Sequence, residues 1–248
     1  MSTDTNYILE RISLPKLPLS FKILFTGYIL SVGFGLLMAG VQIMMTHGMA
    51  DGKVGLSLDD IVYSYYGNKE GTKLESKLNG SMKMNAPDAE RLTLIKWARA
   101  GAPKEEWATT IEPIVKKYCV LCHVPGAPMG DLGTYESVKK HTESDHGASF
   151  SSLTRVSHIH LFGIGFIFFF IGMIFMLAEG IGCFWKAVIV LTPFVFLIID
   201  ILSWWLTKLS PGFAWLTIIG GIGYSIAATI MLAVSLWQMW ITPLRRKA

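Results

Sequence analysis

Two cysteines and a histidine lie within five residues near the middle of the chain, in the segment CVLCH (119–123). Cys119 and Cys122 are three positions apart, so their thiols can form thioether bonds to the two vinyl groups on one edge of a porphyrin. The imidazole of the next residue, His123, is then brought under the iron at the ring centre. This spacing predicts the covalent attachment of one haem c, with His123 as a ligand of the haem iron.

Cysteine pairs at this spacing also occur in redox-active disulfides and in zinc sites. A thioredoxin-like pair is expected in a βαβ context, which the flanking sequence does not indicate. A structural zinc site needs further Cys or His residues at ligand spacing. The third cysteine, Cys183, lies alone between two apolar segments and is interpreted as a packing residue. We therefore prefer haem attachment to both alternatives.

The sequence around this motif resembles that of c-type cytochromes. The segment IEPI (111–114), followed by a basic pair and the cysteine motif, resembles the helix that leads into the haem motif of many bacterial mono-haem cytochromes. The segment LNGSM (78–82), with residues 92–97 after it, resembles the other half of that fold. The resemblance covers residues 55–145 and implies a small α-helical domain that binds one covalent haem.

The order of these two halves differs from that of class I cytochromes c, in which the half with the methionine ligand follows the haem motif. Here the corresponding Gly-x-Met loop precedes the motif, so the implied domain is permuted. The resemblance makes Met82 and Met84 candidates for the sixth iron ligand, with Met82 preferred. His141 and His146 are alternative sixth ligands, and a further alternative leaves that position open. A methionine ligand raises the reduction potential relative to two histidines.

The polar middle of the chain is expected to be helical. Asp88 and Thr134 are of residue types that cap helix N-termini, and each precedes a segment with helical spacing of apolar residues. The helices expected in this part cover residues 57–66, 69–79, 89–100, 110–122 and 135–141. Such a small unit has a limited core, so the haem itself is expected to be its main apolar centre.

The remaining sequence is more apolar than that of a soluble protein. Hydrophobic residues make up 52% of the chain and charged residues 16%, with a mean hydropathy of +0.45, whereas soluble domains carry about 25% charged residues. Four apolar segments are long enough to cross a bilayer as helices, which takes about 20 residues. They cover residues 22–46, 159–180, 186–206 and 212–241. The first exceeds the roughly 7–15 apolar residues of a signal peptide, so it is interpreted as a retained anchor.

The distribution of basic residues predicts the orientation of these segments, because short cytoplasmic loops are enriched in Lys and Arg. One set of segment ends is rich in basic residues, whereas the opposite short loop carries only Lys208. The basic residues of the first set are Arg11, Lys16, Lys22, Lys186, Arg245, Arg246 and Lys247. Both termini are therefore expected in the cytoplasm of a bacterium and residues 47–157 in the periplasm. The net charge of +4 is modest and scattered, which gives no support to nucleic-acid binding.

The predicted fold is all-α: a bundle of four transmembrane helices with a small α-helical c-type cytochrome domain inserted between the first and second helices. The first helix, residues 22–46, follows a cytoplasmic segment at 1–21. The periplasmic cytochrome domain covers residues 47–157. The other three helices lie within residues 158–241, and a basic cytoplasmic tail covers 242–248.

Four ionisable residues lie at or near the predicted outer edge of the membrane: His47, His158, His160 and Asp200. Ionisable groups inside membrane spans are functional candidates because burying them is costly. One hypothesis is a quinol site, in which His158 or His160 accepts a hydroxyl proton and Asp200 orients the imidazole. A second is a haem b held between His47 and one of the later histidines, and a third is copper bound by His47 and nearby methionines. A structural role without any cofactor is the remaining interpretation.

These observations lead us to expect a membrane-bound mono-haem c-type cytochrome that transfers single electrons at the periplasmic face of a bacterial inner membrane. The expected partners are the lipid bilayer, other membrane subunits of a respiratory or photosynthetic electron-transfer complex, and a periplasmic redox protein. One alternative is an enzyme, a quinol-oxidising cytochrome that uses the histidine and aspartate site. Another alternative is a haem-based sensor or ligand-binding membrane protein.

Overall fold

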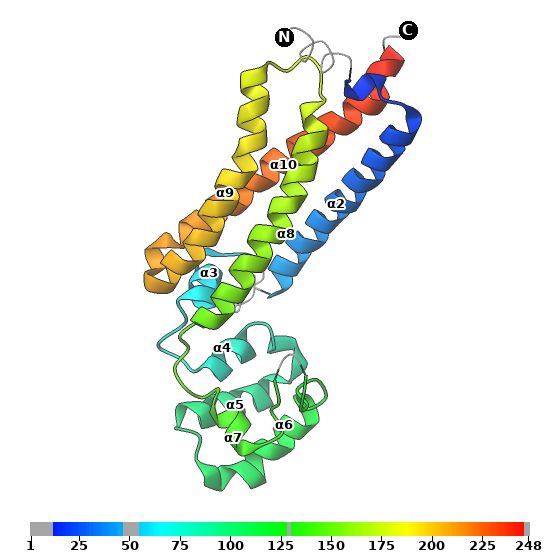
Figure 1. Cartoon of the computed structure of the whole chain (residues 1–248). Coiled ribbons are helices and arrows are strands. Elements are labelled where there is room, and N and C mark those ends of the chain that lie inside the picture. Colours follow the sequence, from blue (N-terminus) through cyan, green and yellow to red (C-terminus); the bar gives the residue numbers. More distant parts are fainter. Residues whose placement is uncertain (1–11, 47–54, 128–129, 246–248) are drawn as a thin grey trace. The chain divides into compact units, whose positions relative to one another are not determined.

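The computed structural model describes residues 12–46, 55–127 and 130–245 (Figure 1). These residues form helices and turns without any β-strand, and an isolated antiparallel bridge joins Thr72 to Ser144. The chain divides into two compact units. Unit 1 consists of residues 1–40, 151–205 and 215–248, and unit 2 consists of residues 41–150 and 206–214.

Four long apolar helices dominate the part of the chain that the structure describes, and each is long and apolar enough to cross a membrane. They are α2 (Leu19–Thr46), α8 (Phe150–Met176), α9 (Cys183–Leu209) and α10 (Ala214–Arg245). At about 1.5 Å per residue, even the shortest exceeds the roughly 30 Å of a bilayer core. The prediction of an all-α protein with four transmembrane helices is confirmed.

The start of α8 differs from the sequence-based expectation. This helix begins at Phe150 and not near residue 158, because the polar residues before His158 continue the same helix. His158 and His160 therefore lie more than two turns inside α8, and not at its first residues.

The start of α2, the α8–α9 turn and the end of α10 meet at one end of unit 1 (Figure 1). The backbone N–H of Leu14 donates to the carbonyl of Leu177 at 2.9 Å. The indole Nε1 of Trp240 donates to the hydroxyl of Thr26 at 2.9 Å. Two hydrogen bonds join the Glu179 backbone to the Gln238 side chain, at 2.7 and 2.8 Å. The basic residues at the ends of these helices therefore gather at one end of the unit.

Helices α9 and α10 approach each other closely where α10 carries glycine. A Cβ atom added to Gly220 would lie 2.7 Å from the Cβ atom of Asp200. A Cβ atom added to Gly223 would lie 2.4 Å from carbons of the Phe196 ring. Neither distance is possible in a packed interior, so these glycines set the spacing of the two helices.

Unit 2 contains the shorter helices. They are α3 (Leu58–Tyr65), α4 (Lys73–Asn79), α5 (Asp88–Arg99), α6 (Glu112–Tyr118) and α7 (Tyr135–Lys139). A π-helical turn, Trp107–Ile111, leads directly into α6. Thr134 caps α7 as predicted, through a capping box with Ser137. Pro87, and not Asp88, is the N-cap of α5, and Asp88 is the first helical residue.

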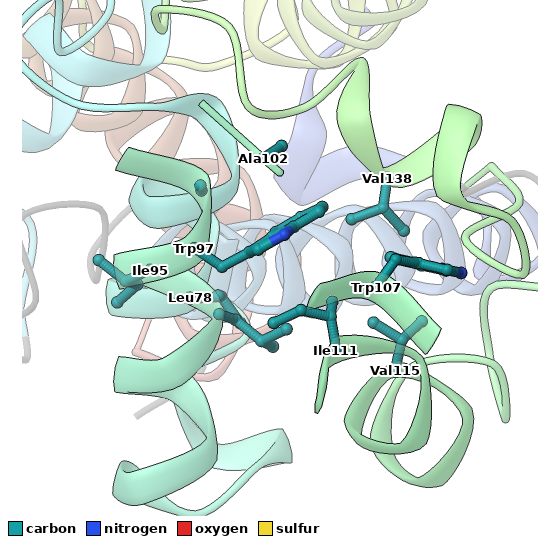
Figure 2. Packing of buried hydrophobic residues seen from close by; sticks show 10 residues of the cluster. Leu78, Ile95, Trp97, Ala102, Trp107, Ile111, Val115 and Val138 are labelled. Atoms are coloured by element: carbon teal, nitrogen blue, oxygen red, sulfur yellow. The ribbon is translucent and has the colours of Figure 1, made fainter. Parts of the chain in front are cut away.

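The core of unit 2 is built around two tryptophans, which lie among aliphatic side chains of several helices (Figure 2). The ring centroids of Trp97 and Trp107 are 5.8 Å apart, and the Tyr135 ring lies 5.7 Å from that of Trp107. The indole of Trp97 donates to the carbonyl of Pro103 at 3.0 Å, and the Tyr135 hydroxyl donates to the carbonyl of Ala102 at 2.8 Å. The indole of Trp97 and the hydroxyl of Tyr135 are therefore both hydrogen-bonded, as buried polar groups usually are.

The segment after α7 is hydrogen-bonded to the segment that opens α4. The N–H groups of Lys73 and Leu74 donate to the carbonyls of Glu143 and His141, at 3.0 and 2.7 Å. Gly147 lies against the backbone of Tyr65, because a Cβ atom added to this glycine would lie 2.4 Å from the Tyr65 carbonyl oxygen. The φ angle of Gly147, +66°, also favours glycine. These contacts place residues 141–147 along the backbone of residues 65–74.

Candidate cofactor site

Unit 2 contains a cavity of about 580 Å³ beside its aromatic core, a volume within the range of roughly 300–1,000 Å³ that is usual for cofactor sites. Helices α4, α5 and α6 and the segments around α7 form its walls. Most of its lining is apolar: Leu74, Leu78, Ala86, Leu94, Val115, Leu132 and Val138. The same cavity is lined by Cys119, Cys122, His123, Met82 and His141. The structure thus brings five of the sequence-predicted site residues to one place.

The two cysteines lie on the turn that follows α6. The N–H groups of Cys119 and His123 donate to the carbonyls of Val115 and Cys119, both at 2.9 Å, so the turn continues the helix and presents both thiols to the cavity. Cys119 is half-buried against the core of unit 2, and Cys122 is exposed. Burial raises the pKa of the Cys119 thiol.

The His123 imidazole is oriented by the backbone of a later loop. Its Nδ1 lies 3.1 Å from the carbonyl oxygen of Gly130. Because a carbonyl oxygen can only accept, Nδ1 must carry the hydrogen and donate it. The lone pair then resides on Nε2, which is the arrangement found in histidines that bind a metal through Nε2.

The two predicted methionine ligands lie in different environments. Met82 lines the cavity and packs against the core of unit 2. Its sulfur accepts a long hydrogen bond, 3.6 Å, from the side-chain amide of Asn85. Met84 is 85% exposed and lies outside the cavity lining. The structure therefore brings Met82, but not Met84, to the cysteine motif.

The two predicted histidine alternatives differ in the same way. His141 is half-buried and lines the cavity. Burial, followed by the positive charge of Lys73, lowers the pKa of His141, which favours the neutral imidazole. His146 is exposed and lies outside the cavity lining, and its carbonyl oxygen accepts a hydrogen bond from Lys208.

The polar part of the cavity lining suits a ring that carries carboxylates. Lys73 and Lys77, from the first and second turns of α4, line the cavity together with Ser81 and Asn85. A haem has a flat apolar ring and two propionate groups. The residues present fit such a group: apolar walls for the ring, two thiols for its vinyl groups, imidazole donors for iron and lysines for the propionates.

In unit 1, one of the predicted membrane histidines lies near the buried aspartate. The His160 ring packs edge-on against Trp204, with centroids 5.3 Å apart. The indole of Trp204 donates to the carboxylate of Asp200 at 3.1 Å, and the Tyr224 side chain interacts with the same carboxyl group. Asp200 is only 5% exposed. Trp204 therefore connects His160 and Asp200.

His158 lies on a different face of α8 and is exposed. Its ring packs edge-on against Phe162, with centroids 6.4 Å apart. An apolar groove of about 280 Å³ begins at that phenylalanine. The groove is lined by Leu161, Phe162, Gly165, Phe166, Phe169 and Phe194. The structure thus separates His158 from His160 and Asp200, and the predicted role of His47 falls outside the described residues.

Several site residues were missed by sequence reasoning. The spacing of four residues between Asp200 and Trp204 places both on one helix face, and this spacing could have revealed their contact. Lys73 and Asn85 could have been proposed only from a three-dimensional fold, since nothing in their local sequence marks them. The same holds for Gly130, which contributes only a backbone carbonyl.

The four apolar helices define a multi-pass membrane protein of all-helical fold. Comparison with protein families agrees with this class: a family model described as a transmembrane helical domain matches residues 133–247. The matched part includes α7 to α10 and leaves the cysteine motif outside. No curated protein and no solved structure matches the chain.

Proposed function

We propose that the protein is a membrane-anchored mono-haem c-type cytochrome that transfers single electrons at the periplasmic face of a bacterial inner membrane. One observation carries the proposal: Cys119, Cys122 and His123 line the same mainly apolar cavity, which is large enough for a cofactor. The resemblance of residues 55–145 to c-type cytochromes supports it independently.

In this proposal each part of the cavity has a distinct task. Cys119 and Cys122 would hold the ring through thioether bonds, and His123 would supply one iron ligand through Nε2. The apolar walls would exclude water, and Lys73 and Lys77 would neutralise the propionates. The bound haem supplies reversible one-electron chemistry between ferrous and ferric iron, whose potential depends on the axial ligands.

The proposed location follows from the chemistry of attachment and from the basic residues. Haem attachment to cysteines requires reduced thiols and an attachment apparatus on the outer side of the membrane. Lys16, Lys22, Lys186 and Arg245 gather at one end of unit 1, which favours the cytoplasm for that end. A single helix would suffice to tether a haem, so we propose that four helices dock to other membrane subunits of an electron-transfer complex, with a periplasmic redox protein as partner.

The test is haem attachment in a host that matures c-type cytochromes. We expect one covalent haem per chain, measured as a pyridine haemochrome and as haem that stays with the polypeptide under denaturing conditions. The double substitution C119A/C122A should abolish covalent haem. Cys183→Ala is the matched control and should retain it, because that thiol lies at the start of α9. Wild-type protein without covalent haem would contradict the proposal.

A second function, quinol oxidation, is favoured by the position of His158 beside an aromatic groove on the apolar surface of α8. The groove offers space for the apolar part of a lipid-soluble quinol, and the imidazole offers a base for its hydroxyl proton. Oxidation to the quinone releases two protons and two electrons. One haem accepts a single electron, so a soluble one-electron acceptor must remove electrons between the two transfers.

This second function is tested by mixing the purified protein with a quinol analogue and recording haem reduction. His158→Ala should slow the reduction at least tenfold, whereas the matched control His146→Ala should leave it unchanged. The rate of haem reduction in His160→Ala shows whether the second membrane histidine is also needed. If the wild-type protein is not reduced, or if His158→Ala is reduced at the wild-type rate, the quinol function is excluded.

A further inference from the structure

The cavity of unit 2 contains a second imidazole besides that of His123. His141 follows α7, whereas His123 follows α6, so the two residues reach the cavity from different elements. Both side chains line the same cavity. The cavity therefore contains two nitrogen donors, one from each of two separate segments of the chain.

The backbone of His141 is held in place by hydrogen bonds on both sides. Its N–H donates to the carbonyl of Val138 at 2.9 Å, and its carbonyl accepts from the N–H of Leu74 at 2.7 Å. Val138 and Leu74 themselves line the cavity. The backbone of His141 is thus anchored to two parts of the cavity wall, which fixes the point from which its side chain starts.

The imidazole of His141 makes no hydrogen bond to any side chain or backbone group in the described ranges 12–46, 55–127 and 130–245. The imidazole is half-buried and lines the cavity, so its ring nitrogens are available to a metal ion there.

The rival ligand Met82 is already accounted for by its surroundings. Its sulfur accepts a hydrogen bond from Asn85, and its side chain packs against the core of unit 2. Packing and a hydrogen bond within the chain therefore hold Met82 on the cavity wall.

We infer that His141, and not Met82, is the sixth ligand of the haem iron, which gives the iron two axial histidines. The inference rests on the proposed haem function. Two histidine ligands give a lower reduction potential than one histidine and one methionine. Because both axial positions are filled, the iron does not bind external gases, and the site is confined to electron transfer.

The test compares three variants of the purified haem protein: His141→Ala, Met82→Leu and the exposed control His146→Ala. We expect low-spin wild-type protein that does not bind carbon monoxide when reduced and lacks the red charge-transfer band of methionine-ligated ferric haem. His141→Ala should become high-spin and bind carbon monoxide, and added imidazole should restore the low-spin spectrum. Met82→Leu and His146→Ala should keep the wild-type spectrum and potential.

A fourth variant, His141→Met, covers the case in which the alanine variant does not fold. It should remain low-spin, gain the methionine band and show a raised reduction potential. A high-spin Met82→Leu, a low-spin His141→Ala or a methionine band in the wild type would each overturn the inference. Those outcomes require attached haem and so leave the proposed function standing, whereas wild-type protein without covalent haem overturns both.

Discussion

Cys119 and Cys122 have different surroundings although they belong to one motif. Cys119 packs against the core of unit 2, whereas Cys122 is exposed. The raised pKa of Cys119 keeps its sulfur in the protonated form, which is a poor nucleophile. The two thiols should therefore differ in reactivity before any haem is attached.

This difference predicts the order of alkylation in protein isolated without haem. At neutral pH an alkylating reagent should modify Cys122 first and Cys119 several-fold more slowly. Because the pKa of Cys119 is raised, its thiolate becomes abundant only above the ordinary cysteine value of about 8.5, so its rate should keep rising at alkaline pH. Mass spectrometry of digested samples over a pH series measures both rates. Faster modification of Cys119 at neutral pH would contradict the structure.

The Trp204 indole is a buried hydrogen-bond donor to a carboxylate inside a membrane helix. Trp204→Phe removes this donor while keeping an aromatic ring, so the Asp200 carboxyl loses a partner. Losing such a partner costs about 1–3 kcal/mol, which should lower the midpoint of thermal unfolding in detergent. Trp215→Phe is the matched control, because Trp215 is 58% exposed, and its midpoint should stay at the wild-type value. Equal midpoints for both variants would exclude a stabilising role for this hydrogen bond.

The two pairs of candidate ligands show where sequence reasoning reached its limit. Met82 and Met84 share one loop, and His141 and His146 share another, so local sequence offers little to separate them. The position of His141 depends on the pairing of residues 71–74 with residues 141–145, which lie about 70 positions away in the chain. The prediction that the cysteine motif attaches haem could be made from sequence because it depends only on local spacing, and it stays a prediction.

Helix α10 packs against α9 through glycines, whereas the glycines of α2 lie in open space within the chain. A Cβ atom at Gly35 would meet no atom within 4 Å, in contrast to the ring contact at Gly223. Glycine thus permits close packing of α10 against α9, whereas the glycine in α2 has open space around it.

This contrast predicts opposite outcomes for two identical substitutions. Gly223→Ala should destabilise the bundle by about 1–3 kcal/mol, because the new methyl group collides with the Phe196 ring. Gly35→Ala should leave stability unchanged or slightly raised, because alanine favours helix and has room there. Thermal unfolding in detergent compares the two directly. A tolerated Gly223→Ala would mean that α9 and α10 lie further apart than described.

The four membrane helices were predictable because continuous apolar segments of this length have few alternatives to a membrane helix. Their ends were less predictable. Helix α8 includes Phe150 to Ser157, whose mixed polarity gives no hydropathy signal, yet these residues continue its hydrogen bonding. The π-helical turn before α6 was not foreseen either, since helical spacing of apolar residues does not distinguish the two kinds of helix.

The predicted orientation of the four helices in the membrane can be tested without purifying the protein. Alkaline phosphatase is active only in the periplasm, so fusions report the side of each junction. Fusions after residues 145 and 210 should be active, and fusions after residues 180 and 245 should be inactive, because basic residues favour the cytoplasm at the latter positions. The reverse pattern would place the cysteine motif in the cytoplasm and contradict haem attachment at the outer face.

Unit 2 also has a property that follows from the close contact between Tyr65 and Gly147. Because the chain enters and leaves this region at neighbouring points, the 66–146 segment has adjacent ends. A segment of that kind can be inserted into another protein, or removed from one, with little strain on the host chain. Residues 66–146 could therefore be exchanged for another small domain with adjacent ends while the four membrane helices are kept.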